Sequence, residues 1–364
     1  MFFAKHRLST LLTAVATLAL GACDHNKTTD PDPDPVAGCN GSTIQIGSTI
    51  STPTTWESCN VYVVTGNVGV TSTLTIEPGT VVKFKPDAGL ILTGQGHLNG
   101  AGTAAAPVYF TSIKDDAHGG DTNGDGSATK PVKKDWTLVD VSGTTGSTLD
   151  YCQFLYGGKG GTVLDLSLGS ASVTHCTFAH NGEDVSAPTD AVLDAHYATA
   201  GTVVQHNVFY DNVRPLSITS SFDVDDTNTF HNPDKEDEKN QYQGIVTYWD
   251  VNVTKANVRW AETEVAYVNM HNIDINQGQT LTLANNVTVK LLSGVEIVFD
   301  SPDQLINSNG AGVAFTSYKD DTRGGDSNGN AAGNAPAAGD WAGIYQDAVG
   351  FGWLQWSNAY YAGH

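Results

Sequence analysis

The sequence is poor in basic residues and has no long stretch with the apolar periodicity of an amphipathic helix. Only 18 Lys and Arg stand against 39 Asp and Glu, which gives a net charge of −21 at pH 7. A chain this acidic is repelled by phosphate groups, so nucleic acid and anionic membrane surfaces are poor partners of the folded part, whereas divalent cations suit it. Short apolar runs between turn residues, with 39 glycines, predict mostly β structure.

Cysteine is also scarce, at five residues in 364. No pair has the spacing of a metal site. Four of the five can pair in an exported protein, and the simplest pairing joins Cys39 to Cys59 and Cys152 to Cys176. For the second pair, two buried free thiols are the alternative.

The longest apolar run, LLTAVATLAL, lies close to the N-terminus after Lys5 and Arg7. Its position and length predict a signal peptide over residues 1–22 rather than a membrane span. The end of this segment resembles the lipobox of bacterial lipoproteins, which implies that Cys23 is lipidated and anchors the exported chain to the cell envelope, with cell-surface exposure expected. The alternative is a plain signal peptide cut nearby.

Residues 23–38 are polar and rich in Pro and Asp. Such a segment has nothing apolar to bury, so it is predicted to be a disordered tether between the lipid and the folded part.

An internal duplication organises the rest of the chain. Residues 110–136, FTSIKDDAHGGDTNGDGSATKPVKKDW, and residues 315–341, FTSYKDDTRGGDSNGNAAGNAPAAGDW, are identical at 14 of 27 positions without a gap. Upstream, TLTIEPGTVVKF at 73–84 matches TLTLANNVTVKL at 280–291. Repeats of short strands that cannot bury their apolar faces alone predict a solenoid.

Four segments in the middle of the chain align so that Phe154, Phe178, Phe209 and Phe230 coincide. In the same alignment Cys152, Cys176, Asn207 and Asn228 coincide, as do Asn181 and Asn212, with Asn232 displaced by one position. If successive coils of a solenoid stack, these residues form ladders along its axis, with phenylalanine inside and asparagine at the turns.

The strand LTIEPGTVVKF, the segments APVYFTS and LDYCQFLYGG, and their second copies resemble bacterial surface proteins of the pectate-lyase-like superfamily. The resemblance implies an all-β, right-handed parallel β-helix with long inserted acidic loops. The expected parts are a first half with an N-terminal cap (39–232), a charged loop (233–246) and a second half, partly duplicated, with an uncovered last coil (247–364). Because this superfamily includes lyases, hydrolases and adhesins, the resemblance fixes no function.

Each copy of the duplicated insertion carries oxygen ligands in a D-x-N-x-D-like order, the spacing that opens a calcium loop. The chain lacks the closing glutamate of an EF-hand, so a structural calcium site of another kind is predicted, and a solvated loop held by Asx turns is the alternative. The expected ligands are Asp115, Asp116, Asp121, Asn123 and Asp125 in the first copy, and Asp320, Asp321, Asp326, Asn328 and Asn330 in the second.

These features favour a lipid-anchored surface protein with a binding, adhesion or structural-assembly role. Self-association through the open C-terminal coil or binding of a polysaccharide are the expected partnerships. The alternative is an extracellular polysaccharide lyase or glycoside hydrolase, although no run has a distinctive catalytic spacing, so no catalytic residue is assigned. The side chains that would serve it are Lys114, Lys133, Lys134, His175, His206, His231, Asp211 and Asp226, and the aromatic residues that could stack on a sugar are Trp136, Trp341, Trp353, Trp356, Tyr360 and Tyr361.

Overall fold

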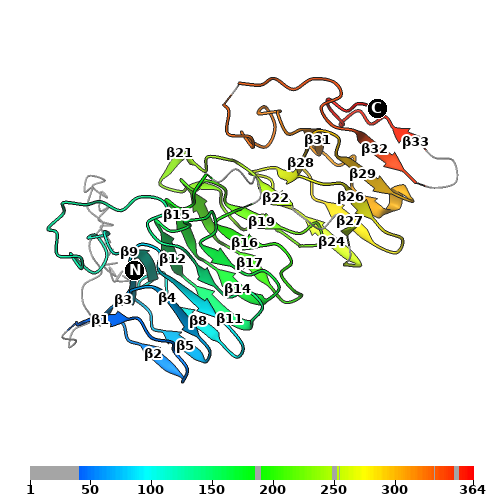
Figure 1. Cartoon of the computed structure of the whole chain (residues 1–364). Coiled ribbons are helices and arrows are strands. Elements are labelled where there is room, and N and C mark those ends of the chain that lie inside the picture. The colour runs from blue at the N-terminus through cyan, green and yellow to red at the C-terminus, as the bar shows by residue number, and fades with distance from the viewer. Residues whose placement is uncertain (1–40, 185–189, 248–251, 254, 332, 348–351) are drawn as a thin grey trace, which may run out of the picture. The chain divides into compact units, whose positions relative to one another are not determined.

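The computed structural model describes residues 41–184, 190–247, 252–253, 255–331, 333–347 and 352–364. Over these ranges the chain is built from β-strands, most of them in parallel sheets, and its one helix is the short 3-10 helix η1 (Pro302–Gln304) (Figure 1). No helix of the described residues is long and apolar enough to cross a membrane. The all-β prediction is confirmed, while the predicted signal peptide, lipidation site and tether lie outside the described residues.

Three parallel sheets share the first part of the chain. The seven-stranded sheet contains β1 (Thr43–Ile46), β3 (Val61–Val64), β6 (Val81–Phe84), β9 (Val108–Ser112), β12 (Cys152–Leu155), β15 (Thr177–Ala179) and β18 (Val208–Tyr210). The six-stranded sheet contains β2 (Thr54–Trp56), β5 (Thr73–Ile76), β8 (His97–Ala101), β11 (Thr145–Asp150), β14 (Ser170–Thr174) and β17 (Val203–Gln205).

The third sheet has ten strands and continues into the second copy. It contains β4 (Asn67–Val70), β7 (Gly89–Leu92), β10 (Val139–Asp140), β13 (Leu164–Asp165), β16 (Leu193–Ala195), β19 (Leu216–Ile218), β22 (Ile245–Thr247), β25 (Tyr267–Asn269), β28 (Thr288–Leu291) and β31 (Ala314–Ser317). Between β3 and β18, strands that are neighbours in a sheet lie three places apart in the chain, as in the pairing of β3 with β6 and of β5 with β8.

Three smaller sheets complete the second part. They contain β23 (Asn252–Val253), β26 (Ile273–Ile275), β29 (Glu296–Phe299), β32 (Gly343–Gln346) and β33 (Gly352–Leu354); β24 (Asn257–Trp260), β27 (Thr280–Leu283) and β30 (Leu305–Ile306); and the antiparallel pair β20 (His231–Asn232) and β21 (Lys235–Lys239).

Alternation of side chains along each strand builds the core. In β5, Leu74 and Ile76 are fully buried while Thr73 and Thr75 are only partly buried, because successive side chains of a strand point to opposite faces. Parallel pairing in register then places like residues above one another from strand to strand.

The predicted phenylalanine ladder is confirmed. Phe154 pairs with Phe178, and Phe178 with Phe209, with ring centroids 4.9 and 5.0 Å apart. Phe230 stacks on Phe209 at 5.3 Å, and Phe110 extends the ladder at the other end, 4.7 Å from Phe154. All five rings are buried.

The asparagine ladder is confirmed with one correction. Asn181 Nδ2 donates to Asn212 Oδ1 at 3.1 Å, but the next member is Asn240 rather than Asn232: Asn212 Nδ2 donates to Asn240 Oδ1 at 2.9 Å. The reason is the hairpin of β20 and β21, which inserts between Phe230 and the ladder position. Thus part of the predicted loop 233–246 is strand, and its last two residues already belong to β22.

The duplication reaches further upstream than the aligned segments. Trp56 stacks on Tyr62 at 4.7 Å, and Trp260 stacks on Tyr267 in the same way at 4.5 Å. The copied strands nevertheless lie in different sheets, because β6 belongs to the seven-stranded sheet and its copy β28 belongs to the ten-stranded sheet.

At the C-terminal end, residues 358–362 take the place that β12 holds in the first copy. Phe315 bridges to Ala359, and Trp341 to Ala362, both in parallel, while β33 covers β32 in antiparallel pairing. The end predicted to be uncovered is therefore covered along β31 and β32.

Candidate functional site

The first acidic insertion, residues 113–135, follows β9 and is fastened to the strand below it by one lysine. Lys83 of β6 is fully buried, and its Nζ donates to the carbonyl oxygens of Asp115 at 2.8 Å and Gly120 at 2.6 Å. A buried ammonium group needs such acceptors because leaving water is costly. Sequence reasoning missed this residue, although a lysine inside the apolar run VVKF was the available signal.

The second insertion, residues 318–340, is fastened in the same way. Lys290 of β28 is fully buried, and its Nζ donates to the carbonyl oxygen of Gly325 and to Ser327 Oγ, the latter at 3.0 Å. Burial lowers the pKa of Lys290 to about 8. Both copies therefore use a core lysine as the anchor of the loop.

Two of the predicted calcium ligands are held by basic side chains. Asp115 Oδ2 accepts from His118 Nδ1 at 2.7 Å, and Asp320 Oδ2 accepts from Arg323 at 2.9 Å. Burial acts to raise the pKa of Asp115, but the hydrogen bond and charge of His118 lower it overall. Each also accepts from a threonine of the preceding strand, Thr111 Oγ1 at 2.6 Å and Thr316 Oγ1 at 2.7 Å, so both carboxylates hold the loops to the strands and are poorly available to an ion.

The D-x-N-x-D segment forms the same turn in both copies. Asp121 accepts from the amides of Gly124 and Gly126, both at 2.8 Å. Asp326 accepts from the amides of Gly329 and Ala331, both at 2.7 Å. Asx turns are the arrangement predicted by the alternative, a solvated loop that needs no ion. The same turns also begin calcium-binding loops.

The asparagines take part in the same turns. Asn123 Oδ1 accepts from the Asp125 amide at 3.3 Å, and Asn328 Oδ1 accepts from the Asn330 amide at 3.1 Å. Asp125 in turn accepts from the amide of Ser127 at 3.0 Å.

One carboxylate oxygen in each loop is buried without a donor among the described residues. These atoms are Asp116 Oδ1 and Asp321 Oδ1, which occupy equivalent positions in the two copies. Burial, followed by the charge of Asp326, raises the pKa of Asp321. A buried carboxylate oxygen without a donor costs free energy that a cation or a proton would offset.

Where strands of the seven-stranded sheet end, a second polar cluster forms. Tyr156, His180 and Asp211 follow β12, β15 and β18, and all three have positive φ, at 63°, 60° and 46°. The His180 ring stacks on Tyr156 at 5.2 Å, and its Nδ1 lies 2.7 Å from Asp211 Oδ2. Lys133, from the end of the first acidic insertion, reaches across to Asp211 Oδ1 at 2.8 Å.

Glu238 of β21 completes this cluster. One ligand atom from each of His180, Asp211 and Glu238 lies within 4.8 Å of the other two, and among the described residues this is the group of His, Cys, Asp and Glu that could hold a metal ion. Asp211 was a sequence candidate for catalysis, whereas His180 and Glu238 were not, because no motif spacing joins them.

The other candidate catalytic side chains do not gather around one groove. Most are held in separate pairs: Lys114 with Asp135 at 2.7 Å, Lys134 with Glu183 at 2.9 Å, His175 with Asp150 at 2.8 Å and His231 with Glu264 at 2.6 Å. His206 stacks on His175 at 5.0 Å. Asp226 is exposed.

The candidate aromatic surface divides into core and surface residues. Trp136 and Trp341 are fully buried, and Trp356 packs on Phe299 at 6.1 Å. Trp353 instead lines a hollow of about 540 Å³ beside Tyr345, Asp274 and Glu296. Burial, followed by the charge of Glu296, raises the pKa of Asp274.

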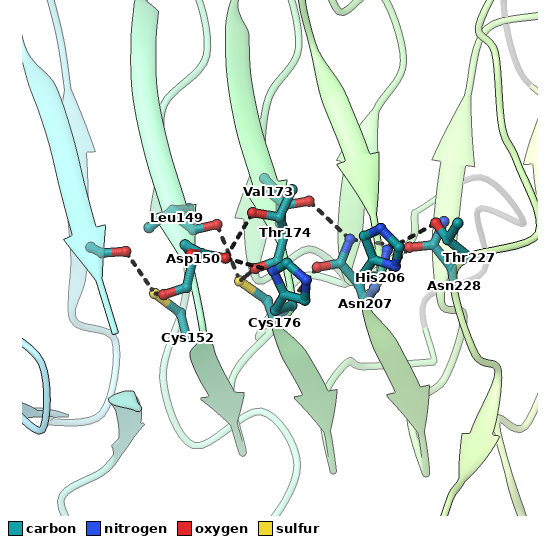
Figure 2. Close-up of polar contacts among 12 residues, drawn as sticks. Leu149, Asp150, Cys152, Val173, Thr174, Cys176, His206, Asn207, Thr227 and Asn228 are labelled. Atoms are coloured by element: carbon teal, nitrogen blue, oxygen red, sulfur yellow. Dashed lines mark hydrogen bonds and ion pairs between the residues drawn. The ribbon is translucent and has the colours of Figure 1, made fainter. Parts of the chain in front are cut away.

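The three cysteines that the structure describes are free thiols, so the predicted disulfide between Cys152 and Cys176 is corrected. Figure 2 shows the two residues next to each other, Cys152 at the start of β12 and Cys176 just before β15. Each thiol donates a hydrogen bond to a backbone carbonyl oxygen, Cys152 Sγ to Gly100 at 3.4 Å and Cys176 Sγ to Leu149 at 3.4 Å. Each thiol therefore has a hydrogen-bond acceptor of its own. Burial raises the pKa of Cys152 well above its ordinary value. Cys59 is also free, and Cys39 lies outside the described residues.

The predicted alignment of these cysteines with asparagines is confirmed. Asn207 Oδ1 accepts from the Cys176 amide at 2.9 Å, and Asn207 Nδ2 donates to Asn228 Oδ1 at 3.1 Å (Figure 2).

Comparison with protein-family models, with curated proteins and with solved structures finds no match to this chain.

Proposed function

We propose that the described strands form a right-handed parallel β-helix in which three strands make one coil. Support comes from the spacing of three between paired strands and from the phenylalanine and asparagine ladders. Parallel strands joined by a crossover connection are right-handed in nearly all proteins. The resemblance to pectate-lyase-like surface proteins is part of this proposal.

In the proposed function, the chain is exported, lipid-anchored at Cys23 and displayed on the cell surface, where it acts as a binding or structural module. Calcium orders its two acidic loops. The observation that carries the calcium proposal is the buried, unpartnered oxygen of Asp116, repeated at Asp321. The neighbouring Asx turns at Asp121 and Asp326 supply further oxygens with the spacing that suits a hard cation.

Calcium titration of the full-length protein in detergent tests this proposal. Calorimetry is expected to show calcium binding, and calcium is expected to raise the unfolding temperature because binding to the native state alone stabilises it. The double variant Asp116→Asn/Asp321→Asn is expected to lose at least about tenfold in affinity, as one charged ligand per site is removed. Asp234→Asn, at an exposed position of the β20–β21 turn, is the matched control. Wild-type protein that takes up no calcium would refute the metal part of the proposal.

The role as a self-associating module is tested by light scattering during size-exclusion chromatography, with calcium and with chelator. A monomer under both conditions would remove assembly from the proposal and leave binding of a separate ligand.

The second candidate function is hydrolysis or elimination on a polysaccharide. It is favoured by the hollow at Trp353, where an aromatic ring that could stack on a sugar lies beside Asp274 and Glu296. A carboxyl group with a raised pKa suits a general acid of a glycosidase. Release of new reducing or unsaturated sugar ends by wild-type protein, and its loss in Asp274→Asn, would establish this function over the binding role.

A further inference from the structure

The cluster of His180, Asp211 and Glu238 has the composition of a transition-metal site rather than of a calcium site. Imidazole nitrogen with carboxylate oxygen is a donor set that zinc accepts, whereas calcium prefers oxygen alone. The cluster lies outside both Asx turns, so nothing in the calcium proposal uses it.

The positions of the three ligands are fixed by the fold. His180 and Asp211 follow consecutive strands of one sheet, β15 and β18, which are paired in register by Phe178 and Phe209. Glu238 comes from β21, which pairs antiparallel with β20. All three side chains are partly buried, so an ion would lose part of its hydration while remaining accessible.

Neighbouring side chains orient the ligands. Tyr156 stacks on the His180 ring at 5.2 Å and Tyr210 meets it edge-on at 5.6 Å. Asn232 Nδ2 donates to Glu238 Oε2 at 2.7 Å. Fixing ligands through such outer contacts is typical of built metal sites.

From this arrangement we propose that His180, Asp211 and Glu238 bind one divalent transition-metal ion of the zinc class, with the remaining coordination position left to water. Nitrogen and oxygen ligands of tetrahedral zinc lie about 3.4 Å apart, given metal–ligand distances of about 2.1 Å. The three ligand atoms already lie within 4.8 Å of one another, which is close to this spacing. The ion takes the place of the proton between His180 and Asp211.

Lys133 competes with the ion for the carboxylate of Asp211. Its Nζ lies 2.8 Å from Asp211 Oδ1 and holds that carboxylate as an ion pair. A cation arriving at Asp211 must compete with this ammonium group, so the lysine sets the affinity of the site.

Zinc titration of the full-length protein in excess calcium, followed by cobalt(II) substitution, tests the proposal. We expect one zinc ion per chain, and visible absorption of tetrahedral cobalt that zinc displaces. His180→Gln and Glu238→Gln should each weaken zinc binding by about tenfold or more, and Lys133→Met should tighten it. His231→Gln is the control, because His231 forms a comparable pair with Glu264 at 2.6 Å but belongs to no such group within the described ranges.

Circular dichroism and a thermal unfolding transition establish that each variant is folded. Zinc affinity that is unchanged in folded His180→Gln and Glu238→Gln, or absent from the wild type, would overturn the proposal. Calcium binding by the wild-type protein is measured separately, so either proposal can fail alone.

Discussion

At the scale of single residues, a carboxyl group with a strongly raised pKa lies away from both loops. Glu262 follows β24 and is 1% exposed. Its Oε1 accepts from the amides of Thr263 and Glu264 at 2.8 and 2.7 Å, whereas its Oε2 is buried without a donor among the described residues. Burial raises the pKa of Glu262 from 4.5 to about 7.

This carboxyl group makes stability depend on pH. Because the folded state holds the proton more tightly, the contribution of Glu262 is complete below pH 4.5 and is lost as the pH rises through about 7. Glu262→Gln is expected to flatten this dependence and to increase the free energy of unfolding at pH 8 by about 3 kcal/mol, at about 1.4 kcal/mol for each unit of pKa shift. Urea unfolding between pH 4 and 8 measures it.

Glu236→Gln, at an exposed position of β21, is the control and should keep the wild-type profile. If the Glu262 variant loses stability with pH as steeply as wild type does, the assignment to Glu262 is wrong.

At the scale of elements, each long insertion depends on a strand below it for its position. Lys83→Met removes the donor to the carbonyls of Asp115 and Gly120 and should lower the free energy of unfolding by about 3 kcal/mol, because buried acceptors lose a charged partner. The insertion should also become the first site of cleavage in limited proteolysis.

Lys85→Met tests whether any lysine of this region has the same effect. Lys85 is exposed two residues further on, so its replacement should leave both stability and cleavage unchanged. Equal cleavage rates in the Lys83 variant and wild type would show that the lysine does not hold the loop.

The sequence predicted ladders better than it predicted contacts between sheets and loops. Phe154, Phe178 and Phe209 could be aligned because parallel pairing repeats a spacing along the chain. The cluster of His180 and Glu238 could not be predicted in this way. Glu238 reaches it through the β20–β21 hairpin, and a hairpin does not repeat at a regular spacing along the chain. The role of Lys83 depends on the burial of its side chain. Residue type alone predicts the opposite, because lysine is almost never fully buried unless it is paired.

At the scale of the whole molecule, the last residues act as a cover for the core. Phe315 N donates to Asn358 O at 2.9 Å, and Trp341 Nε1 donates to Tyr360 O at 2.8 Å. Removal of residues 357–364 is expected to expose the edge of β31 and the Trp341 indole, because an unpaired strand edge invites association.

Tryptophan fluorescence and light scattering measure this outcome: emission should shift to the red, and soluble oligomers should appear. Asp303→Asn, at an exposed position of η1, is the control. A shortened protein that stays monomeric with unshifted emission would show that residues 357–364 do not protect the edge.

The separations between paired residues have a consequence for biogenesis. Val61 pairs with Val81 and Phe154 with Phe178, 20 and 24 residues apart, but Asn99 pairs with Thr148, 49 residues later, because the first insertion intervenes. A chain synthesised from its N-terminus can pair each strand as soon as the short interval before it is complete. Pairing is delayed at both insertions, so misfolding is expected to begin where β8 and β9 wait for their partners.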